Sequence, residues 1–166
     1  MAEFSFTNEH SPSQVGNIVD VLRRPRLWIP TEHDYPDHGA WLEKVEGQVV
    51  AGSKRAMLAY HGRSPVGAVI YQRHHESPRT LEIKNISVDP EAEGRYIGSF
   101  LLRNSEIEAA KVDFPDIEHV TIDTKRTNQG MVEFLLDHGY QLQEVTDLYG
   151  TGTGLDAVFT KSLVAR

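Results

Sequence analysis

Residues 80–103 read TLEIKNISVDPEAEGRYIGSFLLR and combine a strand-like segment with a glycine-containing loop. Its first part has the composition of a β-strand, but the apolar side chains change from odd to even positions along it: Leu81, Ile83, Ile86 and Val88. Because a strand has a side-chain period of two, this change predicts a β-bulge near Lys84-Asn85. Such a bulge would splay the strand from its neighbour and leave backbone donors free for a ligand. The alternative is a central strand covered on both faces, in which the parity of apolar positions carries no information.

The second part of the stretch predicts a phosphate-binding loop that leads into a helix. After Asp89-Pro90 the chain has Gly94 and Gly98, and a helix is expected from about Gly98 to Val112. Glycine lets the backbone approach an anion, and the N–H groups at a helix start carry partial positive charge. The loop lacks the Lys-Ser/Thr pair of a P-loop and the three glycines of a dinucleotide fingerprint. We therefore expect a pyrophosphate site of another kind.

The rest of the chain predicts helices and strands around this stretch. The expected elements are a strand at 4–7, a helix from Ser11-Pro12 to about Arg24, an irregular segment at 25–39, a helix across 41–49, strands at 55–61, 65–74 and 80–88, the helix at 98–112, a strand at 120–122, a helix from Thr127-Asn128 to Gly139, and strands at 140–145 and 157–163. This order predicts the α/β class, with a mixed, mostly antiparallel central sheet and helices on both faces. No repeat or linker divides the sequence, so we expect a single domain over residues 1–166.

The composition narrows the classes of function. The 166 residues include 39% hydrophobic side chains and no Cys, which excludes disulfides, thiolate nucleophiles and Cys-ligated zinc. The formal net charge of −7 argues against binding nucleic acid through its phosphates. The histidine spacing does not place two ligands on one helical face, so no metal site is expected. No secretory signal or membrane-spanning apolar run is visible, so we expect a cytoplasmic protein with no membrane partner.

Two motifs stand in order along the chain: Ile86–Pro90 followed by Glu93–Gly98, and Asn128 followed by a helix that ends at Gly139-Tyr140. They resemble motifs A and B of the GNAT (GCN5-related N-acetyltransferase) superfamily, and the resemblance, with a similar element order from about 54 to 163, covers roughly two thirds of the chain. It implies a GNAT-like acyltransferase that uses acetyl-CoA as co-substrate and no metal. The residues that it implies for CoA binding are Ile86, Ser87, Val88, Glu93, Gly94, Arg95, Tyr96, Ile97, Gly98, Ser99 and Asn128.

Three positions depart from the family pattern. Glu93 stands where the family favours Gln or Arg, and Tyr96 stands where Gly is usual. Leu135 stands where many members have a Tyr that protonates the departing thiolate. The resemblance therefore supports acyl-CoA binding more directly than it supports any one proton donor.

The resemblance also implies catalytic residues. An ammonium must lose its proton before it can attack a thioester, so a base is needed. Glu82 lies eleven positions before Glu93, the spacing at which histone-acetylating members carry a strand-borne glutamate, and it is the candidate base, acting through a water. Since Leu135 cannot donate a proton, Tyr140 and Tyr149 are the candidate acids, and bulk water is the alternative donor. Each candidate also has a structural interpretation, as a solvated strand glutamate or a packed tyrosine.

Three functions stay open. The first is an N-acetyltransferase that moves an acetyl group to an amine of a small molecule or protein by direct attack. The second is a GNAT-type toxin that acetylates aminoacyl-tRNA, which would need a basic groove; candidates for it are Arg23, Arg24, Arg26, Lys54 and Arg55. The third is a non-catalytic acyl-CoA-binding module, which Glu93 and Leu135 favour. A homodimer is left open, and residues 25–39 are expected to line the pocket of an unidentified acceptor.

Overall fold

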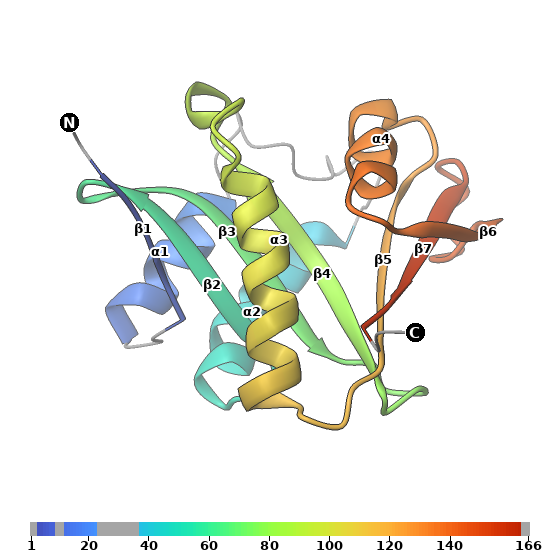
Figure 1. The fold of residues 1–166 in the computed structure, drawn as a ribbon, viewed down its shortest axis with the longest axis horizontal. Coiled ribbons are helices and arrows are strands. Elements are labelled where there is room, and N and C mark those ends of the chain that lie inside the picture. Colours follow the sequence, from blue (N-terminus) through green and yellow to red (C-terminus); the bar gives the residue numbers. More distant parts are fainter. Residues whose placement is uncertain (1–2, 9–11, 23–36, 164–166) are drawn as a thin grey trace.

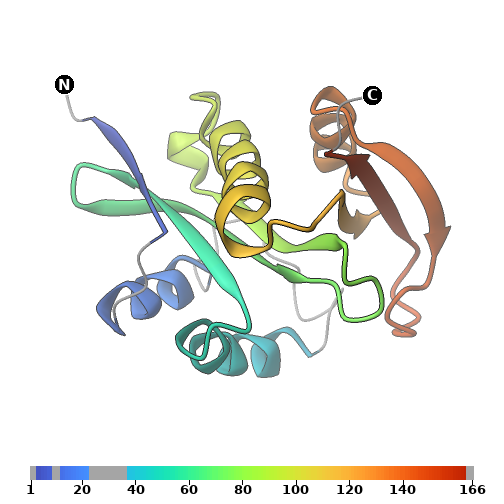
Figure 2. The ribbon, with the colours of Figure 1, turned by 60° about the horizontal axis from the view of Figure 1, so that its bottom comes forward.

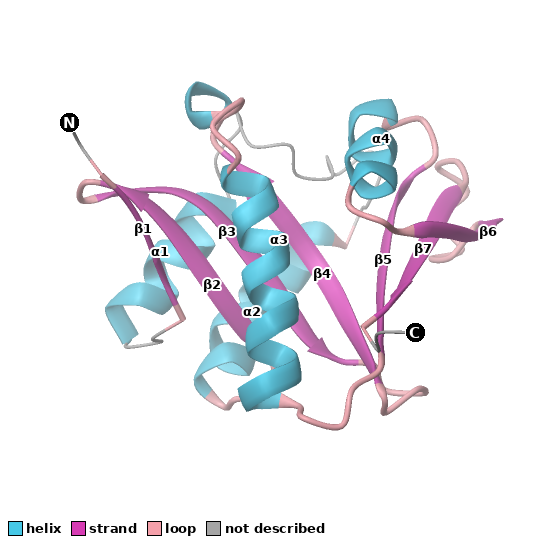
Figure 3. Cartoon of the chain, viewed as in Figure 1, coloured by secondary structure: helices cyan, strands magenta, loops and turns pink. Residues whose placement is uncertain are grey.

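The computed structural model describes residues 3–8, 12–22 and 37–163. Its elements are β1 (Phe4–Thr7), α1 (Pro12–Leu22), α2 (His38–Val50), β2 (Arg55–His61), β3 (Ser64–Arg73), β4 (Thr80–Val88), the 3-10 turn η1 (Pro90–Ala92), α3 (Ile97–Glu108), the π-type turn η2 (Ala109–Asp113), β5 (His119–Lys125), α4 (Gln129–Asp137), β6 (Gln141–Thr146) and β7 (Asp156–Ser162). Figure 1 shows these elements along the chain, and Figure 3 shows them by type. The predicted order of helices and strands is confirmed. Most of the predicted irregular segment 25–39, and the expected helix end near Arg24, lie outside the described residues.

The strands of the described residues form one seven-stranded sheet, in the order β1-β2-β3-β4-β5-β7-β6. Every neighbouring pair is antiparallel except β4 and β5, which are parallel. Figure 2 shows α3 on one side of the sheet and α1 and α2 on the other. The predicted α/β class, with a mixed, mostly antiparallel sheet and helices on both faces, is confirmed.

Each face of the sheet carries its own hydrophobic cluster. Leu58 and Ile70 lie in the cluster under α1 and α2. Val69 and Tyr71 lie in the cluster on the other face, together with Leu101 of α3. Neighbouring residues of β3 therefore belong to opposite faces, as strand geometry requires, and the middle of this strand is buried on both sides.

The predicted bulge in β4 is confirmed. Tyr71 of β3 lies opposite Ile83 of β4. The preceding residue of β3, Ile70, lies opposite Asn85, so Lys84 is the extra residue. A bulge bends its strand and increases the local twist, and here it turns the end of β4 away from the strand on its other side.

The parallel pairing of β4 with β5 ends at the bulge. Its last partners are Ile83 and Ile122, and beyond them the two strands diverge toward α4 (Figure 1). Within the described residues, no strand pairs with this edge of β4 over residues 84–88. The sheet therefore has an open slot in its middle.

The end of α3 differs from the prediction. The helix ends at Glu108 rather than near Val112, and the chain continues through η2. Asp113, the last residue of this turn, accepts a 2.9 Å hydrogen bond from the hydroxyl of Tyr71 and lies 3.1 Å from Nε of Arg55. These contacts tie the wider turn to the sheet, and they depend on residues far away in the sequence.

The helix α4 begins and ends as predicted. The side chain of Asn128 accepts a 3.3 Å hydrogen bond from the N–H of Met131, which caps the helix start, and Gly139 ends it with a φ of 81°. The preceding strand, β5, is longer than the predicted 120–122, because it pairs with β7 along its full length. No helix in the described ranges is long and apolar enough to cross a membrane.

Candidate functional site

A cavity of about 700 Å³ lies at the open slot between β4 and α4. Its lining residues come from the end of β4, the following loop, and the starts of α3 and α4: Ile86, Ser87, Val88, Ala92, Glu93, Gly94, Tyr96, Ile97, Gly98, Ser99, Asn128, Gly130, Met131 and Phe134. Every residue expected to bind CoA is among them except Arg95. The sequence interpretation missed Gly130, Met131 and Phe134, although their spacing of three and four places them on one face of the predicted helix.

The open edge of β4 directs backbone donors at this cavity. The N–H of Asp89 donates a 2.7 Å hydrogen bond to the carbonyl of Val66, on the β3 side. Because successive N–H groups of a strand point to opposite edges, those of Ile86 and Val88 point the other way, toward the slot. A ligand lying in the slot can accept both hydrogen bonds.

The start of α3 supplies a second group of donors. Tyr96 is the N-cap, and its side chain makes no capping hydrogen bond. The first N–H groups of a helix have no partner within the helix, so those of Ile97, Gly98 and Ser99 remain available at the cavity. Gly94, with a φ of 70°, turns the chain into this position. The arrangement suits an anion.

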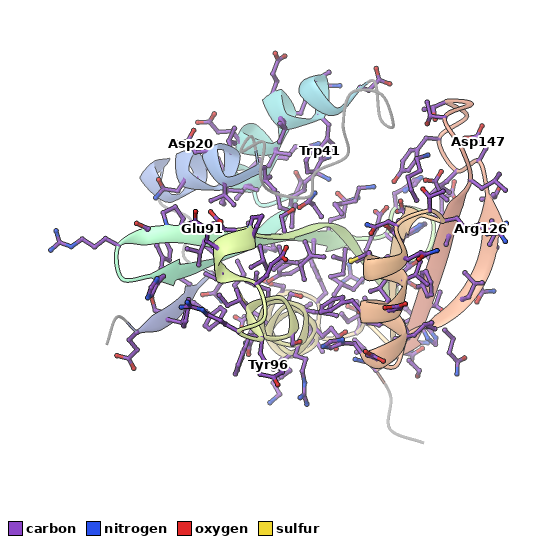
Figure 4. All side chains as sticks on the ribbon, turned by 90° about the horizontal axis from the view of Figure 1, so that it is seen from above. Asp20, Trp41, Glu91, Tyr96, Arg126 and Asp147 are labelled. Carbon is purple, nitrogen blue, oxygen red and sulfur yellow. The ribbon has the colours of Figure 1, made fainter. Side chains whose placement is uncertain are left out.

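Two charged residues of the loop flank Gly94, and of these Glu93 lines the cavity whereas Arg95 does not. Glu93 is exposed, so its carboxylate can be solvated away from a bound anion. Arg95 lies with its guanidinium 5.7 Å from the centre of the Phe4 ring, toward β1. Figure 4 looks down on α3 nearly along its axis and labels Tyr96 at its edge, where the side chain is 76% exposed.

His138 links the two helices that line the cavity. Its Nε2 lies 2.9 Å from Oγ of Ser99, and its Nδ1 lies 2.7 Å from the carbonyl oxygen of Phe134. The carbonyl accepts only, so Nδ1 carries a proton, and in the neutral ring Nε2 accepts from the serine hydroxyl. The start of α3 is thereby tied to the end of α4, a contact that the sequence did not reveal.

Glu82 lies on the face of the sheet under α1 and α2, and both its carboxylate oxygens have donors. Oε1 accepts from Nζ of Lys84 at 2.9 Å, and Oε2 accepts from the amide of Gln72 at 2.7 Å. The buried ammonium of Lys54 donates in turn to Gln72. Burial alone would raise the pKa of Glu82, but the charge and hydrogen bond of Lys84, and then the hydrogen bond of Gln72, outweigh it and lower the pKa.

Asp123 and Tyr149 form a second polar pair on the same face. Thr121 lies opposite Glu82, and strand alternation puts Asp123 on the side of Thr121. The hydroxyl of Tyr149 donates a 3.0 Å hydrogen bond to Oδ2 of Asp123. Burial raises the pKa of Asp123 above its ordinary value, and the opposing effects of Lys84 and Tyr149 do not cancel this. Asp123 is thus a stronger base than an ordinary aspartate, and the sequence interpretation missed it because the predicted strand stopped at residue 122.

Tyr140 lies in the hydrophobic core and not at the cavity. It is 2% exposed, and its hydroxyl donates a 2.6 Å hydrogen bond to Oε1 of Glu106. Burial, followed by the charge of Glu106, raises the pKa of Tyr140. Lys161 donates to the other oxygen of Glu106, so the three side chains form a packed polar group. This geometry does not support the expected role of Tyr140 as an acid.

Two of the candidate basic residues do not form an exposed groove. Lys54 is 5% exposed, and Arg55 pairs with Asp113. Arg23, Arg24 and Arg26 lie outside the described residues. Within the described ranges, no group of three or more His, Asp or Glu side chains could hold a metal ion.

Several solved structures that are similar to this chain are named as acetyltransferases. A GNAT-family putative acetyltransferase from Desulfovibrio desulfuricans has a TM-score of 0.79 and 14% identity, over 98% of this chain and all of the other. The ribosomal-protein-S18-alanine N-acetyltransferase from Escherichia coli has a TM-score of 0.71 and 12% identity, over 99% and 96% of the two chains. The PaiA N-acetyltransferase from Thermoplasma acidophilum, in complex with coenzyme A, has a TM-score of 0.71 and 16% identity, over 96% and 99%. At such identities, the likeness shows the fold.

A comparison of the sequence with family models identifies the family of this chain. A family model described as the acetyltransferase (GNAT) family matches residues 17–140, which is most of the chain and includes both motifs. No curated protein matches the chain. The resemblance read from the two motifs is confirmed, and the chain belongs to the GNAT acetyltransferase family.

Proposed function

We propose that this chain is an acyl-CoA-dependent N-acyltransferase that moves an acetyl group from acetyl-CoA to an amine of a small molecule or a protein. The observation that carries the proposal is the cavity in the slot beside β4, toward which the N–H groups of Ile86 and Val88 point. A structural neighbour solved in complex with coenzyme A supports it.

In the proposed complex, the acyl-pantetheine arm lies along the open edge of β4. The N–H groups of Ile86 and Val88 bind it and polarise the thioester carbonyl. The N–H groups from Gly94 to Ser99, at the positive end of α3, bind the pyrophosphate. The N–H of Glu93, which was expected to join them, donates to the carbonyl of Pro90 instead. Asn128 acts through its position, because its side chain caps α4 and so fixes the opposite wall of the cavity.

The acceptor amine approaches from the face that carries Glu82 and Asp123. Glu82 takes a proton from the ammonium through a water, and the freed lone pair attacks the carbonyl carbon of the thioester. The carbon–sulfur bond breaks, and the thiolate of CoA takes a proton as it leaves. Tyr149 is the proposed donor of that proton, and the second proton, which the nitrogen loses as the amide forms, restores the tyrosine hydroxyl. The hydroxyl of Tyr149 contacts Asp123 on the acceptor face, whereas the hydroxyl of Tyr140 is buried against Glu106.

CoA release measured with a panel of amines tests this proposal. Glu82→Gln is expected to lower kcat about 100-fold while the Kd for acetyl-CoA stays within about twofold. Glu133→Gln, on the exposed face of α4, is the matched control and should change neither. If Asp123→Asn causes the loss and Glu82→Gln does not, Asp123 is the base. A protein that binds acetyl-CoA but releases no CoA with any amine would be an acyl-CoA-binding module instead.

A further inference from the structure

Lys84 occupies an unusual place beside the slot. It is the extra residue of the β4 bulge, so no residue of β3 lies opposite it. Its side chain is 20% exposed, and its Nζ lies 2.9 Å from Oε1 of Glu82. An amine and a carboxylate that could remove its proton are therefore already in contact next to the proposed thioester site.

The thioester site is within reach of this amine. Lys84 precedes Ile86 by two residues, which corresponds to roughly 7 Å along a strand. A lysine side chain has four flexible methylene groups and a length comparable to this separation. The side chain of Lys84, once it leaves Glu82, is therefore long enough for its nitrogen to reach a carbonyl held by the N–H of Ile86.

Lys54 is near the same carboxylate as Lys84, but it is more deeply buried and does not stand at the bulge. Its ammonium is buried and donates to the side chain of Gln72, whose amide holds the other oxygen of Glu82. Burial, and then the charge of Lys84, lowers the pKa of Lys54. Both lysines therefore border the Gln72–Glu82 pair, but only Lys84 stands at the bulge beside the slot. Lys54 is thus an internal control.

We propose that Lys84 is itself an acceptor, so that the chain acetylates its own active-site lysine with acetyl-CoA. The ammonium of Lys84 gives one proton to Glu82, and its lone pair then forms a bond to the carbonyl carbon of the thioester. The carbon–sulfur bond breaks, and the second proton from the nitrogen passes to the departing thiolate, which leaves as CoA. The products are Nε-acetyl-Lys84 and CoA, and Glu82 returns its proton to solvent. This inference rests on the proposed acyl-CoA site.

The modification would change the base that the transferase uses. Acetylation removes the positive charge of Lys84 and its ion pair with Glu82. That charge and hydrogen bond are the main influences that lower the pKa of Glu82 against the effect of its burial. Without them the carboxylate becomes a stronger base and loses a competing partner. Self-acetylation would therefore activate the enzyme toward external amines.

Isotope-labelled acetyl-CoA and peptide mass mapping test the proposal. The label is expected at Lys84, at least about tenfold faster than at Lys44, an exposed lysine on α2, and not at Lys54. Lys84→Arg, which keeps the charge, should lose the label, and Glu82→Gln should slow labelling about 100-fold. The first-order rate constant should not change on dilution, because the amine and the thioester are bound to one chain. Acetylation in the cell would leave an unlabelled acetyl group on Lys84 in the purified protein. If the Glu82→Gln protein lacks this group, its presence in wild type also supports self-acetylation.

Three results would overturn the proposal. These are labelling of Lys84 no faster than of Lys44, equal labelling in Glu82→Gln protein, or a rate that rises with protein concentration. Thermal melting with acetyl-CoA separates this failure from that of the proposed function. If acetyl-CoA raises the melting temperature but Lys84 stays unlabelled, only self-acetylation is wrong. If acetyl-CoA has no effect on melting and no label appears, both proposals are wrong.

Discussion

Oγ of Ser99 lies 2.9 Å from Nε2 of His138, which joins the first turn of α3 to the end of α4 across the proposed CoA site. The same imidazole contacts the carbonyl of Phe134, one of the residues that line the cavity. One side chain therefore contacts both helices that line the cavity.

His138→Ala is expected to weaken CoA binding. A hydrogen bond between neutral groups contributes about 0.5–1.5 kcal/mol, so losing it should raise the Kd for CoA roughly three- to tenfold if it holds the two walls in place. Isothermal titration calorimetry measures this. His75→Ala, at a side chain that is 77% exposed, is the control and should bind normally. Equal affinity in both variants would show that the contact does not shape the site.

The backbone conformation of Tyr96 predicts that Tyr96→Gly and Tyr96→Ala differ in stability. It is the one non-glycine residue of the described part of the chain with a positive φ, 61°. A left-handed conformation costs a residue with a Cβ about 1–2 kcal/mol, and glycine avoids that cost at the expense of a more flexible unfolded chain. Tyr96→Gly should therefore unfold in urea with a free energy about 1 kcal/mol higher than Tyr96→Ala. Since both variants lack the ring, equal stabilities would contradict backbone strain at this residue.

Tyr140→Phe should affect stability and not chemistry. It removes the 2.6 Å hydrogen bond to buried Glu106, which should lower the free energy of unfolding by about 1–3 kcal/mol. The kcat of the folded variant should stay within about twofold of wild type, whereas Tyr149→Phe should lower kcat at least about tenfold. Thermal melting and CoA release measure the two effects. A large loss of kcat in Tyr140→Phe at unchanged stability would restore Tyr140 as the acid.

The raised pKa of buried Asp123 predicts that the free energy of unfolding depends on pH. Its pKa is raised by burial, with Lys84 and Tyr149 opposing and Asp156 and Glu82 reinforcing the shift. When the pKa of a group is higher in the folded than in the unfolded state, the group contributes its full stability at a pH below the unfolded-state pKa. This contribution is lost as the pH rises through the folded-state pKa.

Asp123→Asn cannot ionise but keeps an oxygen that accepts from Tyr149. Its free energy of unfolding should exceed that of wild type at about pH 7 and lose this advantage at about pH 3. Urea titrations at the two pH values measure the difference, with the exposed Asp137→Asn as control. A difference that does not change with pH would show that Asp123 is not perturbed.

Local sequence patterns predicted the slot and the residues around it. The change of parity between Leu81 and Val88 revealed the bulge, because a strand has only two faces. The glycines and the Asn128 cap marked the starts of the two helices that line the cavity. Each of these signals lies within a few residues of the feature that it predicts.

The side-chain partners could not be predicted in the same way. Glu82 meets Gln72, and Asp123 meets Tyr149, only because strands from different parts of the chain lie side by side. Tyr140 was a candidate acid because of its residue type, yet it lies in the core, where its hydroxyl donates a hydrogen bond to Glu106. A residue type suggests a chemistry, but packing decides whether the group reaches the site.

Calorimetric titration of acetyl-CoA into wild type and Gly98→Trp measures whether the slot beside β4 binds acyl-CoA. A side chain at 98 would start 3.6 Å from the ring of Phe134 and 3.7 Å from Val88, so a Trp would fill the cavity. Wild type should bind one acetyl-CoA per chain, and the variant, melting cooperatively, should bind at least about tenfold more weakly. No binding by wild type, or equal binding by the two proteins, would contradict an acyl-CoA site in the slot beside β4.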